Sequence, residues 1–244
     1  MQAAEWICGE LGGTAMRSSE SAGLSDGVWS REGNDHAMSR NLFNLLVCGW
    51  TGAGIAASAV AASTSLTWKL GWGAFILILI VSVLGTIIAM ASDNPIVSLL
   101  GYAMVSIPFG LMLGPVIALY TAASVVKIFA ITVGMVAGLG ILGAIYPKSL
   151  EGWAPFLFGG LLLLLGGLII VPIAAYFGAD VRGAMTVLDW VGVVLFGGYV
   201  IFDFNRAQRV ERTLDNSIDC ALAIYLDFVN IFIRLLSLLG KKDG

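Results

Sequence analysis

Two aspartates, Asp203 and Asp227, lie within long apolar stretches near the C-terminal end of this 244-residue sequence. A carboxylate in the hydrocarbon of a bilayer is costly unless it is neutralised, paired or hydrated, so each one marks a candidate functional site. Two carboxylates about 4 Å apart repel by about 4 kcal/mol at an effective dielectric constant of about 20. If the two groups meet, we therefore expect them to share one proton and to form a pH-sensitive contact between the segments that carry them.

The same oxygen atoms, once deprotonated, are hard ligands suited to Ca²⁺. Two carboxylates supply fewer than the roughly six to eight oxygens that this ion takes, so water or carbonyl groups would complete its shell. Asp203 and Asp227 are thus candidates for pH sensing and gating and for a Ca²⁺ site.

A structural role is the alternative for each aspartate. Asp203 could neutralise Arg206 on the next helical turn, and Asp227 could accept a hydrogen bond from Asn230 or from a hydroxyl. Three further acids near expected helix ends are interpreted as interfacial or capping residues: Asp189, Asp215 and Asp219.

The composition indicates that these acids are held by membrane-spanning elements. Hydrophobic residues make up 58% of the sequence and charged residues 12%, and the mean hydropathy is +0.91, values that do not suit an ordinary globule in water. The few charges between residues 41 and 202 mostly separate apolar runs long enough to cross a hydrocarbon core of about 30 Å. These runs lack the alternation of a transmembrane barrel. The sequence therefore predicts an all-α membrane protein.

The apolar runs predict seven transmembrane helices, at about residues 42–64, 72–92, 96–119, 123–146, 153–178, 185–210 and 218–239. Turn-forming residues separate several of them, at 92–95, 146–149 and 215–217. Residues 1–39 are polar and rich in Ser and Gly, and they are expected to form a flexible N-terminal tail. Residues 40–244 then form a single seven-helix transmembrane domain.

Small residues recur at helical spacing within the predicted spans. The clearest cases are Gly110-x-x-x-Gly114 and Gly134-x-x-x-Gly138. In lipid such residues allow two helices to approach closely and pack by dispersion. We interpret these motifs as helix-packing positions.

The seventh predicted helix carries a continuous polar stripe. Asp227, Asn230 and Arg234 follow Asp219 at offsets of 8, 11 and 15 positions, which at about 100° per residue fall within an arc of about 80°. The stripe extends about 22 Å along the helix, too far for snorkelling at the interface to explain it. This helix is therefore expected to face protein or water, at the centre of the bundle.

The sixth predicted helix carries a matching face, which holds Asp189, Phe196, Tyr199, Asp203 and Arg206. The two helices are expected to form an antiparallel hairpin that turns at residues 215–217. Asp215 is 12 positions from each of Asp203 and Asp227, so this turn would hold the two carboxyl groups at the same depth. The supporting residues of the site are Asp219, Asn230, Arg234, Arg206 and Tyr199.

Basic residues near the helix ends weakly favour a cytoplasmic N-terminus. One side would hold Arg17, Arg31, Arg40, Lys148, Arg206, Arg209 and Arg212, and the other Lys69, Lys127, Arg182, Lys241 and Lys242.

Catalytic chemistry has little support in the sequence. The single His36 has no metal-ligand partner at helical spacing, and the three cysteines lack metal-ligand spacing. No nucleophile, base and orienting group occur together. We predict that the protein is not an enzyme and holds no cofactor, with Ca²⁺ a candidate permeant ion.

The segment YLDFVNIF at residues 225–232, followed by two leucines at 235–236, closely resembles the last helix of the Bax inhibitor-1 family, including its bacterial YccA-like and YetJ-like members. FGGYVIFD at 196–203 resembles the preceding helix of that family, and FGLMLGP at 109–115 also fits. The sequence departs from the family where Asn205 and Arg206 follow Asp203, and residues 72–92 offer no Arg or Glu to contact the acids from a third helix.

The resemblance implies six helices around a central seventh and a pH-sensitive Ca²⁺ leak controlled by Asp203 and Asp227. It also implies an alternative, a membrane-embedded regulator that binds and restrains a membrane protease or a cell-death partner. Its bacterial members suggest an inner (plasma) membrane location, with lipid, Ca²⁺ and protons as the contacts of the protein and no nucleic acid. A proton-coupled transporter is a third option, without inverted repeats to support it.

Overall fold

The computed structural model describes residues 38–243. Residues 1–37 of the predicted N-terminal tail, with Arg17, Arg31 and His36, lie outside the described residues.

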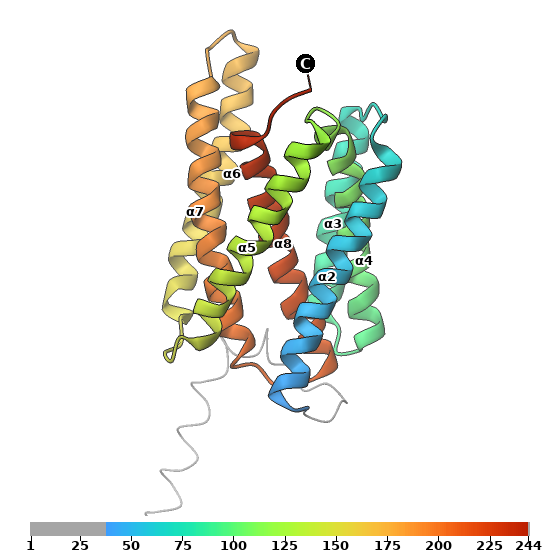
Figure 1. Cartoon of the computed structure of the whole chain (residues 1–244), viewed down its shortest axis with the longest axis vertical. Coiled ribbons are helices and arrows are strands. Elements are labelled where there is room, and N and C mark those ends of the chain that lie inside the picture. The colour runs from blue at the N-terminus through green and yellow to red at the C-terminus, as the bar shows by residue number, and fades with distance from the viewer. Residues whose placement is uncertain (1–37, 244) are drawn as a thin grey trace, which may run out of the picture.

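The described chain folds into seven long helices and one short 3₁₀ helix (Figure 1). Their bounds are α2 (Arg40–Ser65), α3 (Trp72–Ala91), α4 (Pro95–Ile117), α5 (Ala122–Ile145), η1 (Glu151–Trp153), α6 (Ala154–Tyr176), α7 (Arg182–Ala207) and α8 (Leu214–Leu239). All seven long helices are long and apolar enough to span a membrane. The prediction of seven transmembrane helices is confirmed, and the protein is a multi-pass integral membrane protein.

Side chains before the helices fix several of their first residues. Ser39 Oγ accepts a hydrogen bond from the Leu42 N–H at 3.4 Å, and Asn94 Oδ1 accepts from the Ile96 N–H at 2.9 Å. Thr213 Oγ1 accepts from the Asn216 N–H at 3.1 Å, so α8 begins at Leu214. The prediction of a turn at 215–217 is therefore wrong: these residues form the first turn of α8, and the turn lies at 208–213.

Helix α8 is the centre of the bundle (Figure 1). It packs against α2, α3, α4, α5 and α7, whereas α6 packs mainly on α7 and η1. In the most apolar window of α8, 61% of the residues are buried, against 6% for α6. Of the polar stripe of α8, Asp227 and Arg234 are buried, at 4% and 7% exposure. Asp219 and Asn230 are half-buried, so none of the four residues is exposed.

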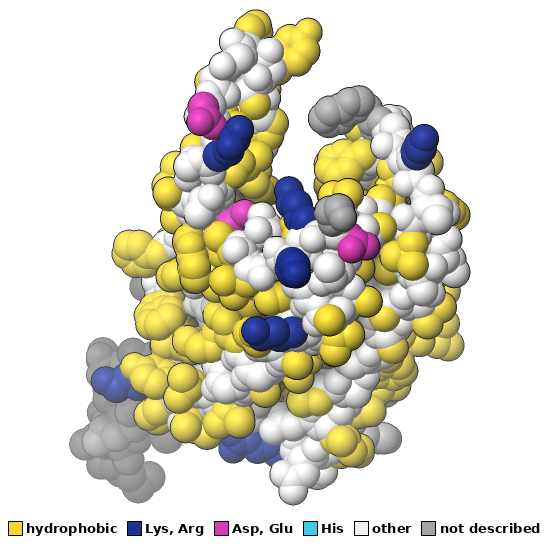
Figure 2. All heavy atoms as spheres, turned by 45° about the horizontal axis from the view of Figure 1, so that its top comes forward, with side chains coloured by type: hydrophobic (Ala, Val, Ile, Leu, Met, Phe, Trp, Pro, Cys, Tyr) yellow, Lys and Arg dark blue, Asp and Glu magenta, His cyan; other side chains and the backbone are white. Residues whose placement is uncertain are grey.

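The outer surface is dominated by apolar side chains. Figure 2 shows them covering much of one face, with few charged groups among them. Leu163, Phe156 and Tyr176 of α6 are 80%, 81% and 87% exposed. In a bilayer such side chains contact lipid, which removes the cost of exposing them to water.

The two glycine motifs differ in what they contact. A Cβ at Gly110 or Gly114 of α4 would collide with α2 at Ser58 or at Ala62 and Ser65, so this motif packs two helices as predicted. A Cβ at Gly134 or Gly138 of α5 would meet nothing within 4 Å. The packing role predicted for the second motif is wrong, because spacing does not reveal which way a glycine face points.

Gly110→Leu is expected to lower the stability of the bundle by about 3 kcal/mol, because the new side chain must displace the α2 backbone at Ser58. Gly134→Leu, the matched control, adds the same side chain where no atom stands in its way. Thermal unfolding of both variants in detergent checks this. Equal melting temperatures for the two would contradict it.

Candidate functional site

Asp203 of α7 and Asp227 of α8 meet inside the bundle, where their side chains are in hydrogen-bond contact. Asp227 is 4% exposed, and Asp203 is partly buried. A carboxylate only accepts hydrogen bonds, so two carboxyl groups can bond to each other only when one carries a proton. We call this contact the carboxyl pair.

Equal sequence distance from Asp215 does not explain why the two aspartates meet, because Asp215 is not in the turn. Asp203 is four residues before the end of α7, and Asp227 thirteen residues after the start of α8, so they stand about 6 Å and about 20 Å from those ends. The six residues 208–213 join these two ends at the bottom of the bundle (Figure 1). The two aspartates are therefore not equally distant from the turn, contrary to the prediction, although they are in contact.

The carboxyl pair has few polar neighbours. Tyr199, one turn before Asp203, lies close enough to interact electrostatically with both acids. Oδ2 of Asp227 is buried and receives no N–H or O–H donor among residues 38–243. Asn230 donates to the Leu226 carbonyl of its own helix at 2.8 Å, so it is not the partner of Asp227. A buried carboxyl oxygen without a donor is costly as an anion, which favours the protonated form.

A small cavity of about 20 Å³ lies between Asp203 and the start of α8. That volume holds about one water molecule. Arg206 and Asp219 are in its wall, together with Val210, Asn216, Cys220 and Ala223. The charge of Arg206 interacts with those of Asp203 and Asp219. Arg206 and Asp219 therefore stand on the side of the pair that faces the α7–α8 turn.

Arg234 does not contact the carboxyl pair. Its Nη1 forms an ion pair with Asp189 Oδ1 on α7 at 3.2 Å, with side-chain exposures of only 8% and 15%. Ser237 Oγ donates to the other oxygen of Asp189 at 2.6 Å, and Arg234 packs against Gly192, where a Cβ would collide with it. Asp189 was expected to be interfacial, but it is the counter-ion of a buried arginine. The polar stripe thus joins α8 to α7 at two separate levels.

Two polar residues that the sequence did not single out for this role connect the helices around the site. The amide of Asn205 donates to the carbonyl groups of Gly143 and Tyr146 at 3.1 Å and of Lys148 at 3.2 Å. Its Oδ1 accepts from the Leu150 N–H at 3.1 Å. Asn205 is 2% exposed, so it ties the α5–α6 connection to α7 two residues after Asp203.

Asp215 is the second of these residues. It is 2% exposed and accepts a hydrogen bond from Ser98 Oγ of α4 at 2.6 Å. Asp215 lies in the first turn of α8, near a helix end as expected, and in addition it is a buried contact to α4. Its identity as a buried contact could not be read from the sequence, because Ser98 lies 117 residues away.

Asn205→Ala is expected to destabilise the bundle by about 3 kcal/mol, because the substitution leaves a buried N–H and several carbonyl groups without partners. Asn230→Ala is the matched control, since that amide bonds only within α8. Thermal unfolding in detergent compares them. The interpretation fails if both variants melt together.

Comparison with known proteins places the chain in a family. A model of the family described as "Inhibitor of apoptosis-promoting Bax1" matches residues 35–244. The inner membrane protein YbhL of Escherichia coli K12 is 29% identical over 142 residues, 54% of this chain and 58% of that protein. An uncharacterized protein of Borreliella burgdorferi is 27% identical over 224 residues, 83% of this chain and 93% of its own.

A fungal relative is also similar. The protein named Bax inhibitor 1 of Schizosaccharomyces pombe is 30% identical over 138 residues, 55% of this chain and 49% of its own. The matched region thus spans only somewhat over half of the Escherichia coli relative. The family match itself extends over all seven long helices, and the chain belongs to the Bax inhibitor-1 family of non-enzymatic membrane proteins.

Proposed function

We propose that this protein is a pH-regulated leak channel for Ca²⁺, in which the carboxyl pair holds α7 against α8 while it retains a proton. The observation that carries the proposal is the contact between Asp203 and Asp227 within the membrane-spanning bundle. Since α8 is the central helix, a change in this contact alters the position of the element around which the others pack.

The sign of the pH response follows from the charges. At low pH the shared proton allows a hydrogen bond between the two carboxyl groups, and the path between α7 and α8 stays closed. At high pH both groups ionise and repel by about 4 kcal/mol at about 4 Å. The contact then weakens, and the exposed oxygens become ligands for a divalent cation. Flux is expected to increase with pH.

The surroundings of the pair fit this proposal. The cavity of about 20 Å³ beside Asp203 offers a position for water between the pair and the α7–α8 turn. Asp219 in its wall adds a third carboxylate on that side. We place the channel in a bacterial inner membrane with its N-terminus in the cytoplasm, in line with the location printed for the Escherichia coli relative and the weak bias of basic residues.

The test is Ca²⁺ flux into liposomes that contain the purified full-length protein and a trapped Ca²⁺ indicator, measured from pH 6 to pH 8. Wild-type flux is expected to rise with pH, and Asp203→Asn is expected to remove most of that dependence because the neutral amide cannot ionise. A flux that rises with pH equally in wild type and in Asp203→Asn excludes the carboxyl pair as the gate. Protein-free liposomes set the background.

A further inference from the structure

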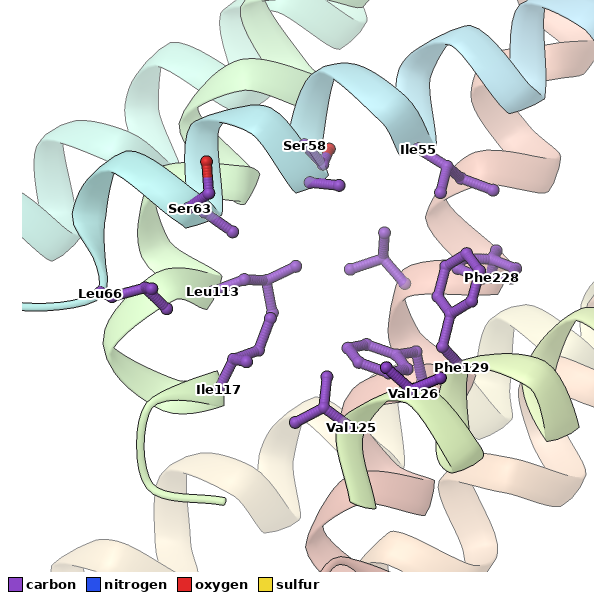
Figure 3. A pocket seen from close by; sticks show the side chains of 14 residues that line it. Ile55, Ser58, Ser63, Leu66, Leu113, Ile117, Val125, Val126, Phe129 and Phe228 are labelled. Atoms are coloured by element: carbon purple, nitrogen blue, oxygen red, sulfur yellow. The ribbon is translucent and has the colours of Figure 1, made fainter. Parts of the chain in front are cut away.

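A second cavity, of about 390 Å³, lies between α2, α4, α5 and α8 (Figure 3). Its lining is almost entirely apolar, and Phe228, Val229 and Phe232 of α8 form part of its wall. Its Ser58 is not available to a ligand, because the hydroxyl already donates to the Ser106 carbonyl or bonds to the Tyr225 hydroxyl, each at 2.7 Å. The cavity therefore offers dispersion contacts and no polar recognition.

The cavity is open at the side of the bundle. Helix α2 packs on α4 and α8, whereas α5 packs on α7 and α8, which leaves a gap between α2 and α5. Lining residues of these two helices are exposed, among them Leu66 at 42% and Val126 at 67%. In a membrane the opening faces the hydrocarbon, so lipid and not water has direct access to it.

The depth of the cavity is that of one leaflet. It lies along the C-terminal half of α2, and Leu66 marks the end at which that helix finishes (Figure 3). Trp68, 48% exposed, and Lys69 follow in the next turn, and these residue types mark the interface between membrane and water. The positive charge of a lysine at such a helix end complements the phosphates of lipid headgroups.

We propose that this cavity binds one acyl chain of a membrane phospholipid, which enters between α2 and α5 and contacts α8. A water-filled cavity is excluded by the lining, because a water molecule needs two to four polar partners. The volume lies within the range of about 300–1,000 Å³ typical of small-molecule sites. The bound chain touches Phe228, the residue after Asp227, from the side of α8 away from α7. This site does not depend on the proposed channel function.

Photocrosslinking tests the proposal. The full-length protein is placed in liposomes of phosphatidylethanolamine and phosphatidylglycerol with a trace of phosphatidylglycerol that bears a diazirine within one acyl chain, and the adducts are mapped by mass spectrometry. Phe228, Val229 and Phe232 are only 4%, 3% and 5% exposed. Adducts on residues 228–232 are expected, because the probe reaches this central helix through the cavity. Adducts on the exposed residues of α6, such as Phe156 and Leu163, report the general contact with lipid.

Two variants complete the test: one is designed to fill the cavity, and its control adds a side chain outside the cavity. Ala59→Leu combined with Ser63→Leu adds two side chains to exposed positions of its wall and is expected to reduce adducts on 228–232 at least fivefold, with those on α6 unchanged. Ala53→Leu, an exposed position of α2 outside the cavity, leaves both sets unchanged. Adducts on 228–232 that are absent in wild type, or that persist undiminished in the double variant, overturn the proposal.

Discussion

Asp227→Asn is expected to abolish the pH dependence of Ca²⁺ flux. The substitution keeps the shape of the side chain, and its amide can donate to Asp203 at every pH, so α7 and α8 stay joined. In the wild-type protein, repulsion of about 4 kcal/mol between the two carboxylates changes the equilibrium constant for loss of the shared proton by nearly three powers of ten. We therefore expect wild-type flux to rise about tenfold or more between pH 6 and pH 8, and flux through Asp227→Asn to stay low and constant.

Infrared spectroscopy measures the proton directly. Wild type is expected to show the carbonyl band of a protonated carboxyl group at pH 6, and Asp227→Asn to lack it. Asp180→Asn is the control: that side chain is 81% exposed, 3.9 Å from Arg182 Nε, and accepts a hydrogen bond from the Arg182 backbone N–H at 3.2 Å. A variant Asp227→Asn that keeps both the band and the wild-type pH response would refute the shared proton.

Arg234→Met is expected to cost about 3–5 kcal/mol of stability, the largest loss among the substitutions considered. The change leaves the carboxylate of Asp189, 15% exposed, without its counter-ion. Removing one member of a buried ion pair is more damaging than removing both, because the remaining charge stays in a medium of low dielectric constant. Unfolding of the purified protein in detergent measures the loss.

A double-mutant cycle separates the ion pair from packing. Asp189→Asn combined with Arg234→Met is expected to recover most of the stability that Arg234→Met loses, since no charge remains unpaired. Arg182→Met provides the contrast. Its ion pair with Asp180 is exposed at 95% and 81%, so its loss is expected to leave the melting temperature unchanged. Additive effects of the two buried substitutions would show that the ion pair contributes no coupling.

The helices could be predicted from the sequence because bilayer thickness sets the length of an apolar run. All seven long helices lie within a few residues of the predicted spans. The residues at the start of α8 were misassigned for a local reason: Asp-Asn-Ser is typical of a turn, but Thr213 caps the helix just before it. The hydrogen bond to Thr213 therefore determines where the α7–α8 turn ends and α8 begins.

The sequence predicts which residues share one face of a helix better than it predicts which groups those residues contact. Angular spacing placed Asp203 and Asp227 on facing stripes, and these residues are in contact. Arg234, on the same stripe, bonds to Asp189 instead. Asn205 bonds to backbone groups 55–62 residues before it. Backbone partners leave no mark in the sequence, so such a contact emerges only when the helices are packed.

The two polar contacts between α7 and α8 have a mechanical consequence. Asp189 and Asp203 are fourteen positions apart on α7, a separation of about 21 Å along the helix. With the Asp189–Arg234 ion pair as a fixed pivot, a tilt of α7 by about 10° moves its Asp203 end by about 4 Å. That displacement exceeds the diameter of a water molecule. A small rotation of one rigid rod thus suffices to let solvent pass between the aspartates.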